Sequence, residues 1–127
     1  MGVDVESLAA PDEARRLARR IVTPQEATAI EGLSGRPLQR AVLRLWTRKE
    51  AWAKATGAGL GAGLDRLEVP IGADQWGVRL ASTEPWWLFA LRGPDFDDLD
   101  AALVVSGDKG EGAPTVTVAE MHHAARS

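Results

Sequence analysis

The alternation of apolar and polar positions divides the chain into a helical first half and a second half rich in strands. Residues 2–6 alternate small or apolar side chains with acidic ones, which predicts a short strand with both carboxylates on one face. Pro11, followed by two acidic residues, is typical of a helix start, and this helix is expected to run to about Val22.

Two further helices are predicted before residue 58. Residues 23–26, Thr-Pro-Gln-Glu, fit a capping box, so a short helix should follow to about Leu33. Residues 35–37, Gly-Arg-Pro, open a longer helix that Gly57 is expected to end as a left-handed cap. The apolar stripe of this helix has helical spacing and consists of Leu38, Val42, Leu45, Trp52 and Thr56.

The second half has the pattern of an antiparallel sheet. Strands are predicted over residues 64–69, 76–81, 86–92 and 101–105, separated by turns rich in Pro, Gly and Asp. A glycine-rich loop over residues 106–114 and a last strand over residues 115–118 should follow. We therefore expect one α+β domain over residues 1–118, with a flexible tail over residues 119–127.

Length and composition exclude several classes of protein. A chain of 127 residues is about one domain. It has no cysteine, which excludes disulfides, thiolate metal sites and a cysteine nucleophile. The longest apolar run, residues 85–91, is far shorter than the ~20 residues of a membrane helix. No apolar signal peptide is recognised at the N-terminus, so a cytoplasmic location without membrane association is expected.

Charge is distributed unevenly along the chain. The formal net charge is −3, yet residues 15–54 contain ten basic residues and three acidic ones. A nucleic-acid-binding domain would more often be basic throughout, so no nucleic acid is expected. A local basic surface suits an acidic protein or a phosphorylated small molecule, although solvated helix faces explain it equally well. The basic residues of the first helix are Arg15, Arg16, Arg19 and Arg20.

Asp4 and Glu6 are the first candidates for chemistry. On a strand they project from one side, about 7 Å apart at roughly 3.3 Å per residue. Two neighbouring carboxylates repel each other unless a cation lies between them, and oxygen ligands suit Mg²⁺, which often also binds a phosphate. The alternative is an exposed strand with two solvated acids, and these two residues alone favour that alternative.

The third helix adds charged residues at the border of its apolar stripe. Trp46, Glu50 and Lys54 follow each other at intervals of four and share one face. Glu50 and Lys54 could form an ordinary surface ion pair. However, charges beside an apolar stripe are costly unless they are paired or bind a metal, and Lys49 lies on the stripe itself. A Mg²⁺ site would explain Glu50, and a phosphate would explain Lys54.

These segments together resemble a known family. The sequences GVDVE at residues 2–6 and WTRKEAWAKATGAGL at residues 46–60 are similar to the two signature motifs of the 4′-phosphopantetheinyl transferases. Residues 22–26 also resemble the family's intervening hydrophobic-Thr-x-x-Glu element. The motifs have the right order and separation. The resemblance covers residues 2–69 well and the later strands more loosely.

The resemblance implies a reaction and a site. Such enzymes transfer the phosphopantetheine arm of coenzyme A to a serine of an acyl or peptidyl carrier protein, require Mg²⁺ and release 3′,5′-ADP. At the matching positions Asp4, Glu6 and Glu50 would hold Mg²⁺, and Glu50 would also be the candidate base for the serine hydroxyl. Lys54 would contact phosphate. Chemistry of this kind depends mainly on positioning and charge neutralisation.

Other motif residues have weaker assignments. Glu26 would support the site electrostatically, and Lys49 is a candidate cofactor contact whose role stays open. A helix cap explains Gly57 fully, and a phosphate contact at Gly59 is a possible addition. Outside the motifs, His122 and His123 are expected to be solvated. The tryptophans at positions 76, 86 and 87 are expected in the core or an interface.

The family has two size classes, and the chain shares features with both. Short members form trimers, and long members contain two similar halves. This chain has the length of the short class, while its motifs resemble the second half of the long class. We therefore expect a homo-oligomer, a trimer or alternatively a dimer, or a chain that lacks an N-terminal half. An inactive half that only binds carrier protein or coenzyme A is the alternative function, and an unrelated nucleotide-binding fold is a weaker one.

Overall fold

The computed structural model of the chain describes residues 1–57, 63–80, 84–91, 99–107, 114 and 116, and their fold is α+β as expected. The chain begins with one strand, continues with three α-helices and ends with three more strands, and all the strands belong to one antiparallel sheet. The elements are β1 (Gly2–Ser7), α1 (Pro11–Ile21), α2 (Pro24–Ile30), α3 (Gly35–Thr56), a 3-10 helix (Leu64–Arg66), β2 (Trp76–Arg79), β3 (Trp86–Leu91) and β4 (Leu99–Ser106).

Within the described ranges the sheet has four strands in the order β1-β4-β3-β2, and all neighbours are antiparallel. The first strand of the chain therefore lies at one edge, paired with the last described strand. In this pairing Asp4 lies opposite Ala102, and Glu6 lies opposite Asp100. The N-terminal strand is thus held in register by β4, about a hundred residues away in the sequence.

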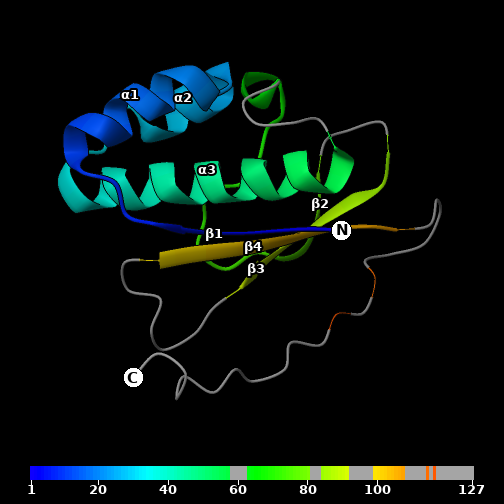
Figure 1. Cartoon of the computed structure of the whole chain (residues 1–127). Helices are drawn as coiled ribbons and strands as arrows, with labels where there is room; N and C mark the ends of the chain where they lie inside the picture. Colours follow the sequence, from blue (N-terminus) through cyan, green and yellow to red (C-terminus); the bar gives the residue numbers. More distant parts are fainter. Residues whose placement is uncertain (58–62, 81–83, 92–98, 108–113, 115, 117–127) are drawn as a thin grey trace, which may run out of the picture.

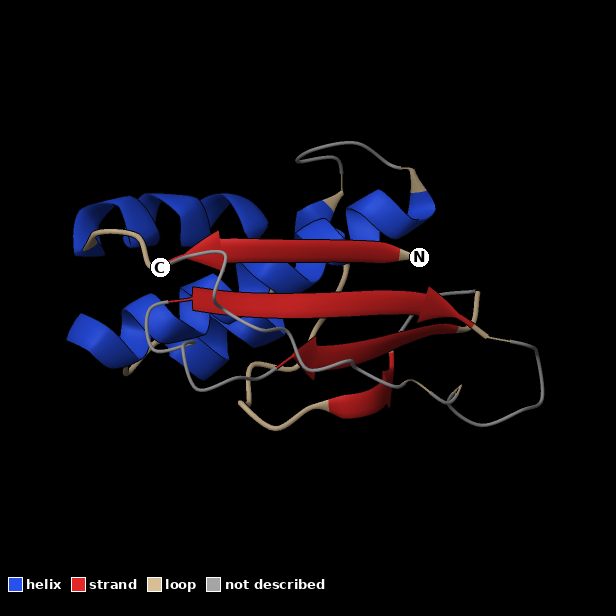
Figure 2. Ribbon diagram, turned by 60° about the horizontal axis from the view of Figure 1, so that its bottom comes forward, coloured by secondary structure: helices blue, strands red, loops and turns tan. Residues whose placement is uncertain are grey.

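The helices cover one face of the sheet, and α3 lies closest to it (Figure 1). Helices α1 and α2 pack on the side of α3 that faces away from the strands, and a second view shows all the helices behind the sheet (Figure 2). Because α3 lies between two layers, its residues 47–51 are buried on every side. No helix in the described part of the chain has the length and hydropathy needed to span a membrane.

The helix boundaries follow the predicted signals. Pro11 starts α1, whose buried positions Ala14, Ala18 and Ile21 form one face. At α2 the Thr23 hydroxyl accepts a hydrogen bond from the Glu26 N–H at 3.2 Å, and the Glu26 carboxylate accepts one from the Thr23 N–H, so the capping box is complete. Gly57 ends α3 in the left-handed conformation, with φ 75°.

Two expectations about this region are wrong. Residues 64–69 form no strand; a 3-10 helix is followed by residues without regular secondary structure, and this segment contacts Lys49 of α3. The carbonyls of Leu64 and Leu67 accept hydrogen bonds from Lys49, and the N–H of Val69 donates to Glu26, so side chains replace a strand partner here. The apolar stripe of α3 also stops before Thr56, which is exposed because the last turn extends beyond the core.

The remaining strands are close to the predicted ones. β2 and β3 begin at the expected residues, Trp76 and Trp86, and β4 begins two residues earlier than expected. Trp86 packs against the core as expected, and Trp87 is half-buried, but Trp76 is largely exposed and touches Phe89 edge-on. The strand over residues 115–118, the tail, His122 and His123 lie outside the described residues, as does most of the glycine-rich loop.

Gly2 allows β1 to approach α3 unusually closely. A Cβ atom at this position would lie 2.5 Å from the backbone nitrogen of Ala55, and still closer to the carbonyl oxygen of Ala51. Both are backbone atoms of a helix, so the strand itself would have to move. Gly2→Ala is therefore expected to lower the free energy of unfolding by about 1–3 kcal/mol, as overpacking does.

Urea denaturation measures this effect, and Gly32→Ala is the matched control because nothing lies within 4 Å of a Cβ added there. Equal stability of the two variants would show that β1 can shift without loss. Since Asp4 follows two residues later on the same face, displacement of β1 by Gly2→Ala should also weaken any ligand bound at that carboxylate.

Candidate active site

The side chains on one face of β1 point toward α3. Gly2 and Asp4 are buried and Glu6 is half-buried, whereas the alternate residues Val3 and Val5 are exposed. This is the alternation that the sequence pattern predicted. It directs both carboxylates into the narrow space between strand and helix, so Asp4 and Glu6 are not the solvated acids of an exposed strand.

Helix α3 meets this strand with Trp46, Glu50 and Lys54. The ammonium of Lys54 donates a hydrogen bond to Asp4 Oδ1 at 2.6 Å. Asp4 and Glu6 on the strand and Glu50 and Lys54 on the helix form a row of charged side chains. At the end of this row away from Lys54, the indole N–H of Trp46 donates to the Glu6 carboxylate. Glu50 lies between these two pairs on the same face and interacts electrostatically with Asp4, Glu6 and Lys54. The structure thus brings together four of the expected site residues.

The charges in this row are poorly compensated. Burial raises the pKa of Glu50 above its ordinary value, and the negative charge of Asp4 adds to the rise. Burial and Asp4 likewise raise the pKa of Glu6, although the Trp46 hydrogen bond opposes this. The hydrogen bond to Asp4 raises the pKa of Lys54. Three carboxylates therefore share one nearby ammonium, which leaves local negative charge for a cation to neutralise.

Two oxygen atoms in the row have no hydrogen-bond partner although they are buried, namely Asp4 Oδ2 and Glu50 Oε1. Buried polar atoms are rarely left unpaired, and unpaired carboxylate oxygens are the ligands that hard divalent cations prefer. The donor set therefore fits Mg²⁺. Within the described residues, however, no three acidic or histidine side chains converge closely enough to form a metal centre as they stand.

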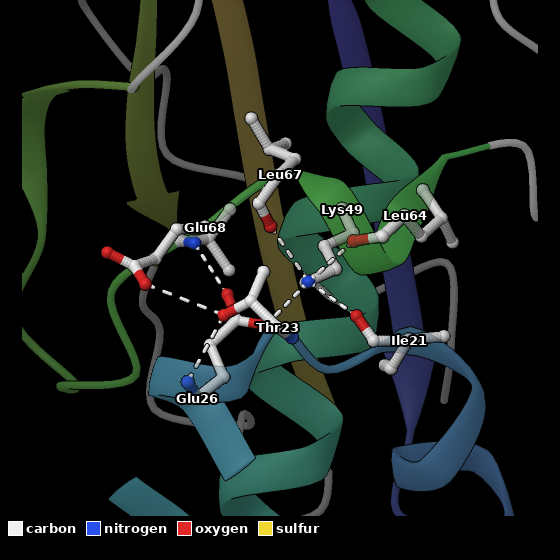
Figure 3. A network of polar contacts seen from close by, with 8 residues as sticks. Ile21, Thr23, Glu26, Lys49, Leu64, Leu67 and Glu68 are labelled. Carbon is white, nitrogen blue, oxygen red and sulfur yellow. Dashed lines mark hydrogen bonds and ion pairs between the residues drawn. The ribbon is translucent and has the colours of Figure 1, made fainter. Parts of the chain in front are cut away.

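Lys49 and Glu26 lie elsewhere, in a separate buried network (Figure 3). The Lys49 side chain is fully buried, and its ammonium lies 2.6 Å from Glu26 Oε1. It also donates to the carbonyl oxygens of Ile21, Leu64 and Leu67, at 2.5, 2.7 and 2.8 Å. Burial lowers the pKa of Lys49, and the Glu26 carboxylate opposes this shift. Four oxygens thus surround the three ammonium protons.

In this network Lys49 does not have the position of a cofactor contact, and Glu26 is its ion-pair partner. A cofactor phosphate has no access to an ammonium that is enclosed by protein oxygens, so the expected cofactor contact does not fit this arrangement. Glu26 completes the α2 cap and accepts the Val69 N–H at 2.7 Å. Both residues connect α1, α2 and α3 to residues 64–69. They thereby help to hold α3, the helix that carries Glu50 and Lys54.

The other expected contacts have simpler positions. Gly57 is exposed at the C-terminus of α3, where its helix-cap role explains it, and Gly59 lies outside the described residues. The four arginines at positions 15, 16, 19 and 20 are all exposed on α1. They are therefore available to a partner, and none of them belongs to the row of carboxylates.

Two residues of α3 have contacts that the sequence did not indicate. The sequence placed Trp46 on the face of Glu50 and Lys54 but gave it no role, whereas its N–H donates to the Glu6 carboxylate. Arg48 is fully buried and donates to the Pro70 carbonyl at 2.5 Å, and burial lowers its pKa to about 10. Helical spacing places Trp46 beside Glu50, but it does not indicate a hydrogen bond to a strand residue. The buried position of Arg48 has no signal in the sequence, because its partner lies in an irregular segment.

The comparison with known families agrees with the family that the motifs suggested. A family model described as the 4′-phosphopantetheinyl transferase superfamily matches residues 1–103, which include β1, all three helices and most of β4. The chain belongs to the 4′-phosphopantetheinyl transferase superfamily. Asp4, Glu6, Glu50 and Lys54 all lie within the matched residues, in the two segments that resemble the signature motifs.

The relatives of this chain include proteins named 4′-phosphopantetheinyl transferase and proteins named holo-[acyl-carrier-protein] synthase. The 4′-phosphopantetheinyl transferase HetI of Nostoc sp. is 34% identical over 107 residues, which cover 84% of this chain and 44% of HetI. The holo-[acyl-carrier-protein] synthase of Streptococcus agalactiae is 32% identical over 90 residues, covering 67% of this chain and 75% of the synthase. The Synechocystis sp. protein slr0495 is 37% identical over 67 residues, 53% of this chain and 27% of that protein. The chain thus spans less than half the length of HetI and slr0495.

Proposed function

We propose that this chain transfers the 4′-phosphopantetheine arm of coenzyme A to a serine hydroxyl of an apo acyl or peptidyl carrier protein, with Mg²⁺, and releases 3′,5′-ADP. The observation that carries the proposal is the row of Asp4, Glu6, Glu50 and Lys54 between β1 and α3, in a chain of this superfamily. The row combines unpaired carboxylate oxygens with a cation that can move to a phosphate.

The reaction needs one bond to form and one to break. The serine oxygen attacks the phosphorus that bears the pantetheine arm, and the bond from this phosphorus to the oxygen of 3′,5′-ADP breaks. Glu50 accepts the serine proton, directly or through a water molecule. A carboxylate whose pKa is raised by burial is a better base near neutral pH than an ordinary one. The leaving oxygen departs on 3′,5′-ADP as part of its phosphate.

Asp4, Glu6 and Glu50 are the residues that would hold Mg²⁺. When bound there, the ion would neutralise the pyrophosphate and polarise its phosphorus–oxygen bonds. Lys54 has a second task. Its side chain is 48% exposed and is joined to Asp4 by an ion pair, so it can turn from Asp4 toward a phosphate. There it would stabilise the charge that develops on the leaving group.

The transfer itself is measured by mass spectrometry of an apo carrier protein after incubation with the chain, coenzyme A and Mg²⁺. A mass increase equal to one phosphopantetheine group supports the proposal. Binding of coenzyme A or carrier protein without any mass increase would favour the alternative, a half that binds without transferring.

We also propose that the active form is not a monomer. A trimer of this chain, a dimer, or a complex with a separate N-terminal half would supply a second wall for the site. The exposed apolar residues Val3, Val5 and Trp76 fit such contacts. Light scattering at micromolar concentration, combined with the transfer assay, tests this, since a strictly monomeric species with normal transfer would contradict it.

Carrier protein is expected to bind to the exposed arginines of α1. Replacing Arg15 and Arg19 with Glu should raise the KM for an acidic carrier protein more than tenfold, because opposite charges on two surfaces steer and hold the encounter. Binding of coenzyme A should be unchanged. Steady-state kinetics at two salt concentrations measure the effect.

The control for this charge reversal is Arg79→Glu on β2, at the edge of the sheet opposite β1. It changes a charge of the same kind at an exposed position that lies away from α1. If Arg79→Glu affects the carrier protein KM as strongly as the α1 variant does, the effect reflects net charge and not a docking surface on α1.

A further inference from the structure

Arg48 is a buried cation that uses only part of its hydrogen-bonding capacity. Its side chain is fully buried on α3, and its nitrogen Nη1 donates to the carbonyl oxygen of Pro70 at 2.5 Å. The other two nitrogens, Nε and Nη2, are also buried, and in the described part of the chain they have no hydrogen-bond partner. Buried polar atoms are rarely left unpaired, so these two donors are candidates for binding a ligand.

The two unpaired nitrogens lie on one edge of the guanidinium group. This group is planar, and the N–H bonds of Nε and Nη2 on that edge point in nearly the same direction, so one acceptor can receive both. An anionic acceptor forms the stronger hydrogen bond with a charged donor. One turn later on the same side of α3, the indole N–H of Trp52 is likewise buried, with no partner among the described residues.

A second arginine adds positive charge beside Arg48. Arg44 lies one turn earlier on α3 and donates to the carbonyl oxygen of Ile71 at 3.3 Å, next to the Pro70 carbonyl that Arg48 uses. Two guanidinium groups therefore bind successive carbonyls of one segment. Like charges at such close range destabilise each other unless an anion lies nearby.

The described groups near Arg48 do not balance this charge. Burial lowers the pKa of Arg48 to about 10, the carboxylate of Asp100 on β4 opposes the shift, and the charge of Arg44 adds to it. Arg48 is thus still protonated at neutral pH. Among the described residues, two cations and one carboxylate act at this place, which leaves one positive charge for a monovalent anion.

This cluster is separate from the row of carboxylates. Arg48 and Glu50 are two residues apart, about 200° around a helix of 3.6 residues per turn, so their side chains leave α3 in nearly opposite directions. A phosphate held near Lys54 is therefore a different ligand. Burial also favours a small monovalent anion over a phosphate, because the cost of removing an ion from water rises with its charge. Arg44 is only half-buried, which gives a small ion access from the surface.

We propose that Arg48, with Arg44 beside it, binds a single chloride ion at its Nε–Nη2 edge. The site goes beyond the proposed function, since no step of the transfer uses it, and either proposal can fail without the other. Its expected effect is on stability, because an ion that binds the folded chain and not the unfolded one stabilises the fold.

The stability of the chain in two salts tests this proposal. Urea denaturation is measured in sodium chloride and in sodium gluconate at equal ionic strength, since gluconate is too large for a buried site. The unfolding equilibrium constant of the wild type should be lower in chloride, by about tenfold at ten times the Kd. Arg48→Met should show no difference between the salts. Arg19→Met, which removes an exposed cation from α1, should keep the wild-type response.

Bromide crystallography of the wild type keeps the proposal testable if Arg48→Met does not fold. Crystals grown in sodium bromide should show an anomalous peak within hydrogen-bonding distance of Arg48 Nε or Nη2. A peak without any chloride response in solution would mean binding at crystal concentration only and would overturn the proposal. Equal stability of the wild type in both salts, a chloride response that persists in Arg48→Met, or a water molecule at this edge in place of the anion would overturn it as well.

Discussion

Glu50→Gln is expected to abolish phosphopantetheinyl transfer and to leave the fold intact. The substitution removes a proposed Mg²⁺ ligand and the proposed base together, while the side-chain volume hardly changes. The rate should fall well over tenfold, which corresponds to more than about 1.4 kcal/mol of activation free energy. The mass assay with apo carrier protein measures the rate, and Glu31→Gln, an exposed residue at the end of α2, is the control.

The stability of the same variant distinguishes a functional Glu50 from a structural one. In the metal-free protein the pKa of Glu50 is raised above 4.5, so the folded state binds its proton more tightly than the unfolded state does. The stability that this proton contributes is fully present below pH 4.5 and is lost as the pH rises through the folded-state pKa. Gln carries no charge at any pH and does not suffer this loss.

Urea denaturation with a chelator present should therefore show that Glu50→Gln is at least as stable as the wild type at neutral pH. The difference should shrink as the pH falls below about 4.5. A variant that is inactive but also much less stable at every pH would show that Glu50 supports the fold, and its loss of transfer would then say nothing about catalysis. Transfer by Glu50→Gln at the wild-type rate would show that Glu50 is neither the base nor a needed Mg²⁺ ligand.

Lys49→Met should have the largest effect on stability. It leaves the Glu26 carboxylate buried without its cation and removes the donor shared by the carbonyls of Ile21, Leu64 and Leu67. Breaking a buried ion pair from one side typically costs about 3–5 kcal/mol. The free energy of unfolding, measured with urea, should fall by about this amount.

Two further variants make this measurement specific. Arg19→Met removes an exposed cation from α1 and should change the stability little. Adding Glu26→Gln to Lys49→Met removes the uncompensated charge and should recover part of the loss, which a double-mutant cycle quantifies. A loss below about 1 kcal/mol for Lys49→Met would show that the network contributes little to the stability of the fold.

The sequence predicted the position of the carboxylate row because two simple periods determine it. Alternation along residues 2–6 places Asp4 and Glu6 on one face, and spacing by four places Trp46, Glu50 and Lys54 on another. A buried helix next to an acidic strand then brings these faces together. The capping box and Gly57 were equally predictable, since both depend only on neighbouring residues.

The Lys49 network could not be predicted in this way. Its acceptors include backbone carbonyls at Ile21, Leu64 and Leu67, which are 28, 15 and 18 residues away. Every residue type has such a carbonyl, so no side-chain pattern marks it. The same contacts explain why residues 64–69 look like a strand from their apolar pattern yet form none. Here tertiary hydrogen bonds to a side chain outweigh local preference.

The position of β1 in the sheet affects how readily this strand opens by local unfolding. β1 is an edge strand, with backbone hydrogen bonds to β4 on one side and no strand on the other among the described residues. Asp4 and Glu6 thus lie on a strand that has a strand partner on one side, whereas an inner strand has partners on both sides. Contacts with α3 also hold β1 in place, through Lys54, Trp46 and the close approach at Gly2. A cation that joins Asp4 and Glu6 to Glu50 would fasten it more firmly. Amide hydrogen exchange in β1 should therefore slow when the site is filled, which makes the N-terminal strand a reporter of occupancy.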